Sequence, residues 1–526
     1  MSKDGSLSQK SEWKRRAEAP SYAVVDIGSN SVRLVVYEQF ARAPLPRFNE
    51  KSLCRLGAGL NETGELSAES FERTVAAARR FQAVAYAMHV DAIDVIATEA
   101  VRRASNGDQL VAAIARETGL AVRILAGTEE AHYAALGVIA GLYQPAGLVG
   151  DMGGGSLEVA EILRDRVGER SVSLPLGALP VQDLLTQADG HAKRHVDALL
   201  KAGLPPALTQ PVFYAVGGGW RAFARVHMAA TSASVRVAHG YSLDAREARA
   251  FAKTVWHLPE AKVAALLGVP TRRIPTIRGS ALVLDRVLKR LAPERVVFSA
   301  LGVREGWLYA KLPPEEQSLD PLIEGARAYG AGQARIPEFG PALVRWTDDL
   351  FPDETHQDRR LRLAACALSD IAWRDHPDVR ATESFRRLLQ FPFVGLDHSD
   401  RVFLSSVIHA RYAGAPDDAA LAASSDLLSA SARRRALILG RVLLLGYRLS
   451  GGVPEILADA HLRITVDVVQ LHVGKGARGP DSEVVRDRLD LVASAIGVRQ
   501  TEIVEAADDE AILSRQLDPA ASSHDA

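Results

Sequence analysis

The most regular feature of the apolar and polar pattern is a unit of strand, tight turn and strand that occurs twice. The first copy follows the apolar run at residues 23–25 and has the sequence Asp26-Ile-Gly28-Ser29-Asn30-Ser31. The second copy follows the run at residues 148–150 and has the sequence Asp151-Met-Gly153-Gly154-Gly155-Ser156. Both copies lead into another run rich in Val and Leu, which predicts a β-hairpin at each place. The repeat predicts two related half-domains.

Residues 22–312 alternate between predicted strands and predicted helices, a pattern typical of an α/β protein. Apolar residues at three- and four-residue steps after Ser67 predict a helix with that serine as its N-cap. Thr128 is predicted to N-cap another helix, which continues to about residue 142. Further strands are predicted at residues 32–37, 93–97, 122–125, 157–163, 172–174, 212–216 and 296–299, and further helices at 107–118, 192–202 and 244–256.

The pattern changes after residues 313–316, a Pro-Pro-Glu-Glu segment that is predicted to be a linker. Residues 321–455 are rich in Ala and Leu at helical spacing and predict a mostly α-helical region. A smaller α/β unit is predicted after it, with a strand at 462–468 and an amphipathic segment at 481–497. The predicted domains are residues 21–133, 134–312, 318–455 and 456–517, with disordered tails at 1–20 and 518–526.

Composition is that of an ordinary globular protein, with 47% hydrophobic and 24% charged residues in a chain of 526. The formal net charge is only −1, so a polyanionic substrate would have to meet a local basic surface. Cys54 and Cys366 offer neither a disulfide framework nor a metal knuckle, and no zinc-type histidine spacing or G-x-S-x-G elbow occurs. The most apolar window near the C-terminus, residues 436–447, is too short to span a bilayer, and the first residues lack a signal-peptide core. These features predict a cytoplasmic protein.

The two glycine turns are the first candidates for chemistry. Their backbone N–H groups can converge on phosphate oxygens, and Asp26 and Asp151 can hold a hard cation such as Mg²⁺ at the end of each first strand. The alternative is a pair of structural hairpins without a ligand. The residues predicted to bind phosphate in the turns are Gly28, Ser29, Asn30, Ser31, Gly153, Gly154, Gly155 and Ser156.

Other positions add candidate side chains. Glu129 and Glu130 lie in the first turn of a predicted helix, where the local field keeps a carboxylate ionised as a general base needs, or only compensates the helix dipole. Adjacent helix positions point about 100° apart, so only one of the two can face a cleft. Glu158 follows the second turn and would lie near a metal or an attacking water, although a strand glutamate is often only solvated. Arg102, in a loop after a strand, is a candidate for phosphate binding, and Gly218 for contact with a base, a ribose or other backbone.

Six motifs in this order resemble the exopolyphosphatase/guanosine pentaphosphatase family, bacterial members of the actin-like ATPase superfamily. The motifs are Asp26-x-Gly28-Ser29-Asn30-Ser31, Thr98-x-Ala100-x-Arg102-x-Ala104-x-Asn106, Gly127-x-Glu129-Glu130-Ala131, Asp151-x-Gly153-Gly154-Gly155-Ser156-x-Glu158, Gly217-Gly218-Gly219 and Gly302-x-Arg304-Glu305-Gly306. The resemblance implies a duplicated ribonuclease-H-like fold with a cleft between its halves. It also implies Mg²⁺-dependent hydrolysis of a terminal phosphoanhydride. By motif position, Glu130 matches the catalytic base and Arg102 a substrate-contacting arginine, and Asp151, Gly153 and Glu158 match the metal and phosphate positions.

The helical half resembles the third domain of the family's longer members, which looks like an HD-type phosphohydrolase bundle. Ser369-Asp370 stands where a true HD domain would have His-Asp, and a serine cannot ligate a metal as an imidazole does. This difference predicts a channel wall and a dimer platform in place of a second active site.

The resemblance predicts a processive exopolyphosphatase that releases orthophosphate from inorganic polyphosphate. A guanosine pentaphosphate 5′-phosphatase of the stringent response is the nearest alternative, and an actin-like kinase and a non-catalytic polyphosphate or alarmone sensor are others. The expected partners are therefore one of these substrates and a second copy in a homodimer, with no membrane and no specific nucleic acid. Candidates for a basic track that binds the substrate chain, each otherwise a solvated surface cluster, are residues 193–195, 272–273, 359–362 and 433–435.

Overall fold

The computed structural model describes residues 19–505 except 188, 206–207, 267 and 475–481. These residues form two compact units. The first contains the described residues within Met1–Gly325 and Pro392–His398, and the second contains those within Ala326–Phe391 and Ser399–Ala526. The predicted disordered tails lie outside the described residues, apart from residues 19 and 20.

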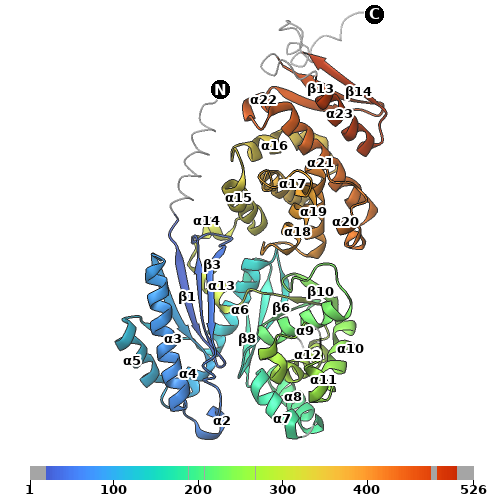
Figure 1. Ribbon diagram of the computed structural model, residues 1–526. Coiled ribbons are helices and arrows are strands. Elements are labelled where there is room, and N and C mark those ends of the chain that lie inside the picture. The colour runs from blue at the N-terminus through green and yellow to red at the C-terminus, as the bar shows by residue number, and fades with distance from the viewer. Residues whose placement is uncertain (1–18, 188, 206–207, 267, 475–481, 506–526) are drawn as a thin grey trace, which may run out of the picture. The chain divides into compact units, whose positions relative to one another are not determined.

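A five-stranded sheet with the order β3-β2-β1-β4-β5 forms the first half of the first unit. β1 (Tyr22–Ile27), β2 (Val32–Tyr37) and β3 (Pro46–Ser52) are antiparallel, whereas β4 (Ala92–Ala97) runs parallel to β1, and β5 (Val122–Ile124) parallel to β4. Helices α3 (Ala68–Ala87) and α5 (Gly107–Thr118) pack on this sheet, on the left of Figure 1. The Ser67 hydroxyl accepts the N–H of Ser70 at 3.3 Å, which confirms the predicted N-cap of α3.

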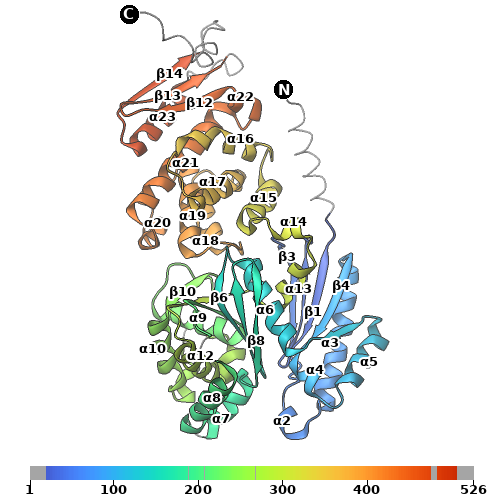
Figure 2. The same cartoon turned by 180° about the vertical axis from the view of Figure 1, so that it is seen from behind.

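The second half repeats this arrangement in a six-stranded sheet with the order β10-β11-β9-β6-β7-β8. β6, β7 and β8 are antiparallel like β1, β2 and β3, and β9 and β11 run parallel to β6 like β4 and β5. Helices α7 to α12 cover one face of this sheet and lie to the left of its strands in Figure 2. The bounds are β6 (Ala146–Met152), β7 (Leu157–Leu163), β8 (Arg166–Leu174), α7 (Ala178–Gln187), α8 (Asp189–Gly203), β9 (Val212–Val216), α9 (Gly218–Ala230), β10 (Tyr241–Asp244), α10 (Ala245–Trp256), α11 (Glu260–Val263), α12 (Ile277–Leu291) and β11 (Arg295–Phe298).

Two helices, α6 (Gly127–Gly141) and α13 (Val303–Lys311), lie between the two sheets (Figure 1). α13 packs its Trp307 and Leu308 on the first sheet, and α6 packs its alanines on the second. The two helices approach so closely that a Cβ atom at Gly306 would overlap the carbonyl oxygen of Tyr133. The glycine in α13 therefore permits the contact that joins the two halves.

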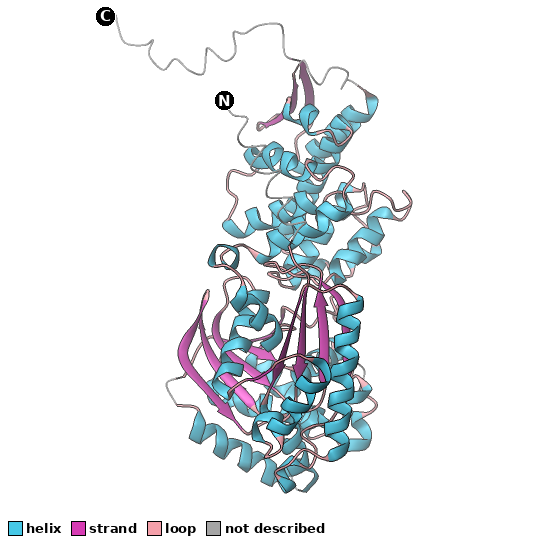
Figure 3. Cartoon of the chain, turned by 90° about the vertical axis from the view of Figure 1, so that its left-hand side faces the viewer, coloured by secondary structure: helices cyan, strands magenta, loops and turns pink. Residues whose placement is uncertain are grey.

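The second unit is mostly helical, with one small sheet of the order β12-β13-β14, as the cyan and magenta elements of Figure 3 show. This region and the duplicated α/β half confirm the predicted fold class. No described helix is long and apolar enough to cross a membrane. The bounds are α15 (Pro321–Gln333), α16 (Phe339–Thr347), α17 (His356–Leu368), α18 (Arg380–Gln390), α19 (His398–Arg411), α20 (Ala419–Ala422), α21 (Ala430–Ser450), α22 (Pro454–Ala458), β12 (Ala460–Ile464), β13 (Val468–Val473), α23 (Glu483–Ile496) and β14 (Gln500–Glu505).

Two local predictions were wrong, and the structure adds a short helix to a third segment. Thr128 does not cap α6, because the helix begins at Gly127 and the Glu129 carboxylate instead accepts the N–H of Ala126 at 2.8 Å. The predicted linker contains a short helix, α14 (Pro314–Gln317), since proline is well suited to a first helical position. The predicted strand at 462–468 is a hairpin of β12 and β13, where Thr465 donates its N–H to the carbonyl of Val468 at 3.0 Å.

Candidate active site

The two predicted turns have the same local structure and lie against each other. Gly28 donates its N–H to the carbonyl of Ser31 at 3.1 Å, and Gly153 donates its N–H to the carbonyl of Ser156 at 3.0 Å. A Cβ atom at Gly154 would lie 3.0 Å from the Cβ atom of Ser29 in the other turn. The fold therefore brings the two glycine turns, 125 positions apart in the sequence, to one place.

The residues that flank the turns differ between the two copies. Asp26 lies opposite Arg33 in the β1–β2 register, whereas Asp151 lies opposite Glu158 in the β6–β7 register. Opposite residues of an antiparallel pair project from the same face of the sheet. The first copy therefore presents an acid and a cation, and the second copy presents two acids.

Glu130 is the acid that faces this site, and its neighbour Glu129 caps the helix. The Glu130 carboxylate is 6% exposed and lies 2.6 Å from Nη1 of Arg102, which also donates to the carbonyl of Leu125. Glu129 instead accepts from Ala126 and pairs with Arg123 at 2.6 Å. Burial raises the pKa of Glu130 to about 7, although the bond to Arg102 acts in the opposite direction. A carboxyl with this pKa can accept a proton near neutral pH.

Asp151 and Glu158 are a second pair of buried acids. Burial raises the pKa of Asp151 to about 6, and burial followed by repulsion from Glu130 also raises the pKa of Glu158. Ser173 donates its hydroxyl to Oε1 of Glu158 at 2.9 Å. Such a concentration of acid is stabilised by a proton or a cation.

The acids fit Mg²⁺ in kind, because this ion takes one or two carboxylates and completes its shell with water and phosphate oxygens. Asp151 and Glu158 offer two such carboxylates on neighbouring strands. Asp26, the third predicted ligand, is paired with Arg304 at 3.3 Å. Within the described part of the chain, no group of three or more His, Cys, Asp or Glu residues could hold a metal ion by itself.

Glu99 is a residue at the site that the sequence analysis missed. Its carboxylate is 5% exposed, accepts the hydroxyl of Ser29 at 2.9 Å and pairs with Arg103 at 2.6 Å. On the other side it lies against Gly155, where a Cβ atom would overlap it. Glu99 therefore contacts both turns, and it occupies the unspecified position of the Thr98-x-Ala100 motif.

A cavity of about 480 Å³ lies beside these acids within the first unit. Seven of its lining side chains are cationic and one, Glu305, is anionic. Arg304 and Arg221 reach from the cavity toward Asp26 and Asp151, and both lower the pKa that burial raises in Asp151. Gly218 also lines the cavity, where a Cβ atom would overlap the guanidinium of Arg273. These arginines come from separate elements, so no local pattern predicted their convergence.

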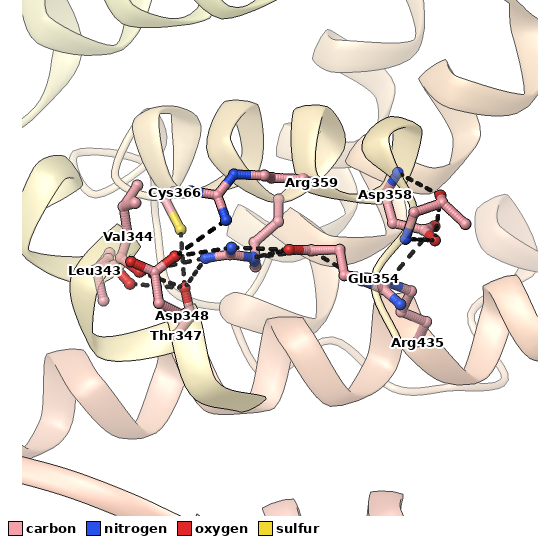
Figure 4. A network of polar contacts seen from close by, with 11 residues as sticks. Leu343, Val344, Thr347, Asp348, Glu354, Asp358, Arg359, Cys366 and Arg435 are labelled. Atoms are coloured by element: carbon pink, nitrogen blue, oxygen red, sulfur yellow. Dashed lines mark hydrogen bonds and ion pairs between the residues drawn. The ribbon is translucent and has the colours of Figure 1, made fainter. Parts of the chain in front are cut away.

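The other predicted basic clusters differ in their environment. Arg273 lines the cavity, whereas the side chain of Arg272 lies outside the described residues. In the second unit Arg362 is buried and pairs with Asp348 and Glu354, each at 2.9 Å. Arg435 pairs with Glu354 from the other side at 2.9 Å (Figure 4). These guanidiniums are neutralised by acids of their own unit, which argues against a role in binding a polyanion.

Comparison with known proteins gives matches over both parts of the chain. The model of the Ppx/GppA phosphatase family matches residues 35–315, and that described as "Exopolyphosphatase, C-terminal" matches residues 322–504. The chain is 28% identical over 306 residues to Exopolyphosphatase 1 of Mycobacterium leprae, which covers 56% of this chain and 89% of that protein. It is 26% identical over 344 residues to Retrograde regulation protein 2 of Saccharomyces cerevisiae, which covers 58% of each. A crystal structure of the Ppx/GppA family member of Aquifex aeolicus has 25% identity and a TM-score of 0.49, covering 55% of this chain and 96% of that chain.

Proposed function

The chain belongs to the Ppx/GppA phosphatase family, and from this membership we propose that it is an exopolyphosphatase, which releases orthophosphate from the end of inorganic polyphosphate. The observation that carries the proposal is the buried Glu130 carboxylate, 2.6 Å from Arg102 and in the electrostatic range of Asp151 and Asp26. A base, a guanidinium and two sets of turn amides are the groups that attack of water on a phosphate requires. The match to the exopolyphosphatase C-terminal model supports polyphosphate as the substrate.

Glu130 accepts a proton from the attacking water as the water oxygen bonds to the terminal phosphorus. The bond between that phosphorus and the bridging oxygen breaks, and the chain leaves one phosphate shorter. Arg102 and the amides around Gly28–Ser31 and Gly153–Ser156 stabilise the charge on the equatorial oxygens. When the terminal phosphate binds, Arg102 either breaks its bond to Glu130 or bonds Glu130 and the phosphate at the same time.

Asp151 and Glu158 are the proposed ligands of Mg²⁺, which when bound would offset the charge of the leaving phosphates. Asp26 can join them only if it exchanges its bond to Arg304. The cationic cavity beside them receives the phosphates behind the terminal one, because its lining carries a large excess of positive charge.

The test of this function is release of orthophosphate from long-chain polyphosphate with and without Mg²⁺. Glu130→Gln should reduce the rate at least about 100-fold while leaving polyphosphate binding measurable. Glu129→Gln is the matched control, because it removes the neighbouring carboxylate from the same helical turn, and it should retain activity. Unchanged turnover in Glu130→Gln would remove this residue as the base.

The cavity favours guanosine pentaphosphate as a second candidate substrate. Its volume of about 480 Å³ is within the range of pockets that bind small ligands, and Gly218 lets the guanidinium of Arg273 lie against its wall. Rates on long-chain polyphosphate and on guanosine pentaphosphate, measured with one preparation, decide between the two. Binding without turnover of either would instead support a regulatory protein, a role that the name of the yeast relative describes.

A further inference from the structure

Four arginines of the second unit lie close enough to Arg448 to repel its charge, and two of the four bond one buried acid. Asp370, which follows α17, receives two bonds of 2.9 Å from the Arg335 guanidinium and one of 3.4 Å from Arg411. Arg380, Arg448 and Arg488 complete the cluster, which we call the Asp370 cluster. Burial lowers the pKa of Arg448, and repulsion from Arg488, Arg411, Arg380 and Arg335 lowers it further. The five side chains come from α18, α19, α21, α23 and the segment after α15, so their approach is a property of the folded unit.

Two tyrosine rings hold these cations together. The Arg411 guanidinium lies 3.7 Å from the ring centre of Tyr447 and 4.6 Å from that of Tyr412. Arg335 lies 5.3 Å from the Tyr447 ring and Arg380 lies 5.5 Å from the Tyr412 ring. Each ring is therefore shared by two guanidiniums, whose attraction to the ring face offsets part of their mutual repulsion.

Donors in the Asp370 cluster are left without a protein acceptor. Arg411 is only 5% exposed, and its buried Nε atom has no hydrogen-bond partner among the described residues. The same holds for Nε of Arg488 within the described chain. A buried guanidinium donor without an acceptor costs free energy, so a ligand atom that accepts from it would stabilise the folded unit.

The contrast with Arg362, another buried arginine of this unit, is informative. Arg362 is surrounded by Asp348, Glu354 and the hydroxyl of Thr347, so its charge and its donors are satisfied (Figure 4). In the Asp370 cluster only two of the five guanidiniums bond the carboxylate, and Arg380 donates instead to the carbonyl of Asp375. A buried arginine of this unit can therefore be fully paired, whereas Arg411, the buried arginine of the Asp370 cluster, keeps one donor without a partner among the described residues.

We propose that the Asp370 cluster binds a short phosphoanhydride anion, either inorganic or the polyphosphate end of a nucleotide. Guanidiniums match phosphate oxygens in geometry and charge, and several of them on different elements can grip one compact anion of three phosphates. The cluster binds this anion without hydrolysing it, because Asp370 is held by Arg335 and Arg411 and Ser369 donates its hydroxyl to the carbonyl of Cys366. The position that the sequence analysis compared with an HD metal site is thus an effector site for anions.

The proposal does not depend on the proposed function, because it is tested by binding. Tripolyphosphate is titrated calorimetrically into the full chain carrying Glu130→Gln, which prevents turnover if the cleft is active. Arg380→Gln and Arg448→Gln are then added together. These two are chosen because neither is bonded to Asp370, so the buried carboxylate keeps its partners. In this double variant the Kd of tripolyphosphate at the Asp370 cluster should rise at least about tenfold, as expected for loss of charge-assisted hydrogen bonds, whereas binding at the candidate active site should not change.

The matched control is Arg463→Gln with Arg499→Gln, two exposed arginines of the same unit outside the Asp370 cluster. It changes the net charge equally and should leave both binding events unchanged. Guanosine 5′-triphosphate is titrated in parallel, and the probe that loses more affinity in the cluster variant identifies the source of the anion. If Arg380→Gln with Arg448→Gln melts like its parent and binds both probes with unchanged affinity, the proposed site is wrong. An equal loss of affinity in the control variant would also contradict it.

Discussion

Glu129 and Glu130 are neighbours in one helical turn, yet the fold shifts the pKa values of their carboxyl groups in opposite directions. Burial raises the pKa of Glu130 to about 7. Two bonds, first from the Ala126 N–H and then from Arg123, lower the pKa of Glu129. The folded protein thus holds the proton of Glu130 more tightly than the unfolded chain does, and the proton of Glu129 less tightly.

We predict opposite effects on stability when each glutamate is replaced. The raised pKa of Glu130 favours the folded state while the carboxyl is protonated. This contribution is complete below the unfolded-state pKa of about 4.3 and is lost as the pH rises through the folded-state pKa of about 7. Glu130→Gln should therefore increase the free energy of unfolding at pH 8 by about 2–3 kcal/mol, with little difference near pH 4. Glu129→Gln should decrease stability at pH 8, by less because Glu129 is more exposed. Thermal unfolding of the first unit at both pH values measures the two effects, and a loss of stability in Glu130→Gln at pH 8 would contradict the assignment of burial as the dominant cause.

Glu99 supplies a second prediction at this scale. Its carboxylate lies between the turns that are proposed to bind phosphate, so its charge opposes the incoming anion. Glu99→Gln keeps a hydrogen-bonding side chain of the same shape and removes the charge. KM for polyphosphate should fall about 3- to 10-fold with kcat changed by less than about twofold.

Steady-state kinetics at constant ionic strength measure this effect. Glu117→Gln on α5 is the control, because it removes an equal charge from an exposed ion pair with Arg79 and Arg116. A KM that rises or stays constant in Glu99→Gln would show that the residue only holds the turns together.

At the scale of elements, the sequence predicted the bounds of strands best where an apolar run adjoins a glycine turn. β2, β7 and β9 have the predicted bounds, because their Val- and Leu-rich runs are buried and their ends are fixed by turns. β3 was missed because its sequence, PRFNEKS, is mostly polar and lies at the edge of the sheet, where none of its residues is fully buried and no alternating apolar pattern is needed. Likewise the site turns and Glu130 were predictable from local motifs. Arg221 and Arg273 were not assigned together, because only tertiary structure brings α9 and the segment before α12 to one cavity.

The contact between α6 and α13 leads to a prediction about elements. Gly306→Ala would place a Cβ atom against the Tyr133 carbonyl, a backbone atom that cannot move without shifting α6. We expect a stability loss of about 1–3 kcal/mol, as in other overpacked contacts, and a fall in phosphate release of about 100-fold, because α6 carries Glu130. Gly332→Ala in α15 is the control, since open space surrounds Gly332, and it should be neutral or slightly stabilising. Wild-type activity in Gly306→Ala would show that the halves do not depend on this contact for the position of Glu130.

At the scale of the whole molecule, duplication supplied one scaffold and divergence gave its halves different chemistry. Five strands of one sheet have the same order and direction as five of the six strands of the other, and each glycine turn contains the equivalent backbone hydrogen bond. The position that holds Arg33 in the first half holds Glu158 in the second. Arg33, a cation that can attract phosphate, and Glu158, an acid that suits a metal, therefore occupy equivalent positions in the two halves.

The chain path between the two units leads to the last prediction. Residues 392–398 belong to the first unit, although the residues on both sides of them belong to the second. His398, the first residue of α19, bonds the carbonyl of Val237 at 2.7 Å through Nε2, and its ring lies 5.2 Å from that of Tyr241. Gly395 donates its N–H to the carbonyl of Gly141 at 2.7 Å. These contacts attach residues 392–398 to the rest of the first unit, and we call this segment the strap.

His398→Ala should therefore loosen the first unit, although sequence alone places the residue in the helical region. The lost hydrogen bond and ring contact are together worth about 1–2 kcal/mol, so amide exchange in β10 should be about 5- to 30-fold faster while α21 is unaffected. Hydrogen exchange measured by mass spectrometry resolves these elements. His376→Ala is the control, because that histidine is exposed and pairs only with the exposed Asp378 among the described residues. Faster exchange confined to α19 would mean that His398 stabilises its own helix, and that the strap contributes nothing to the unit on which it lies.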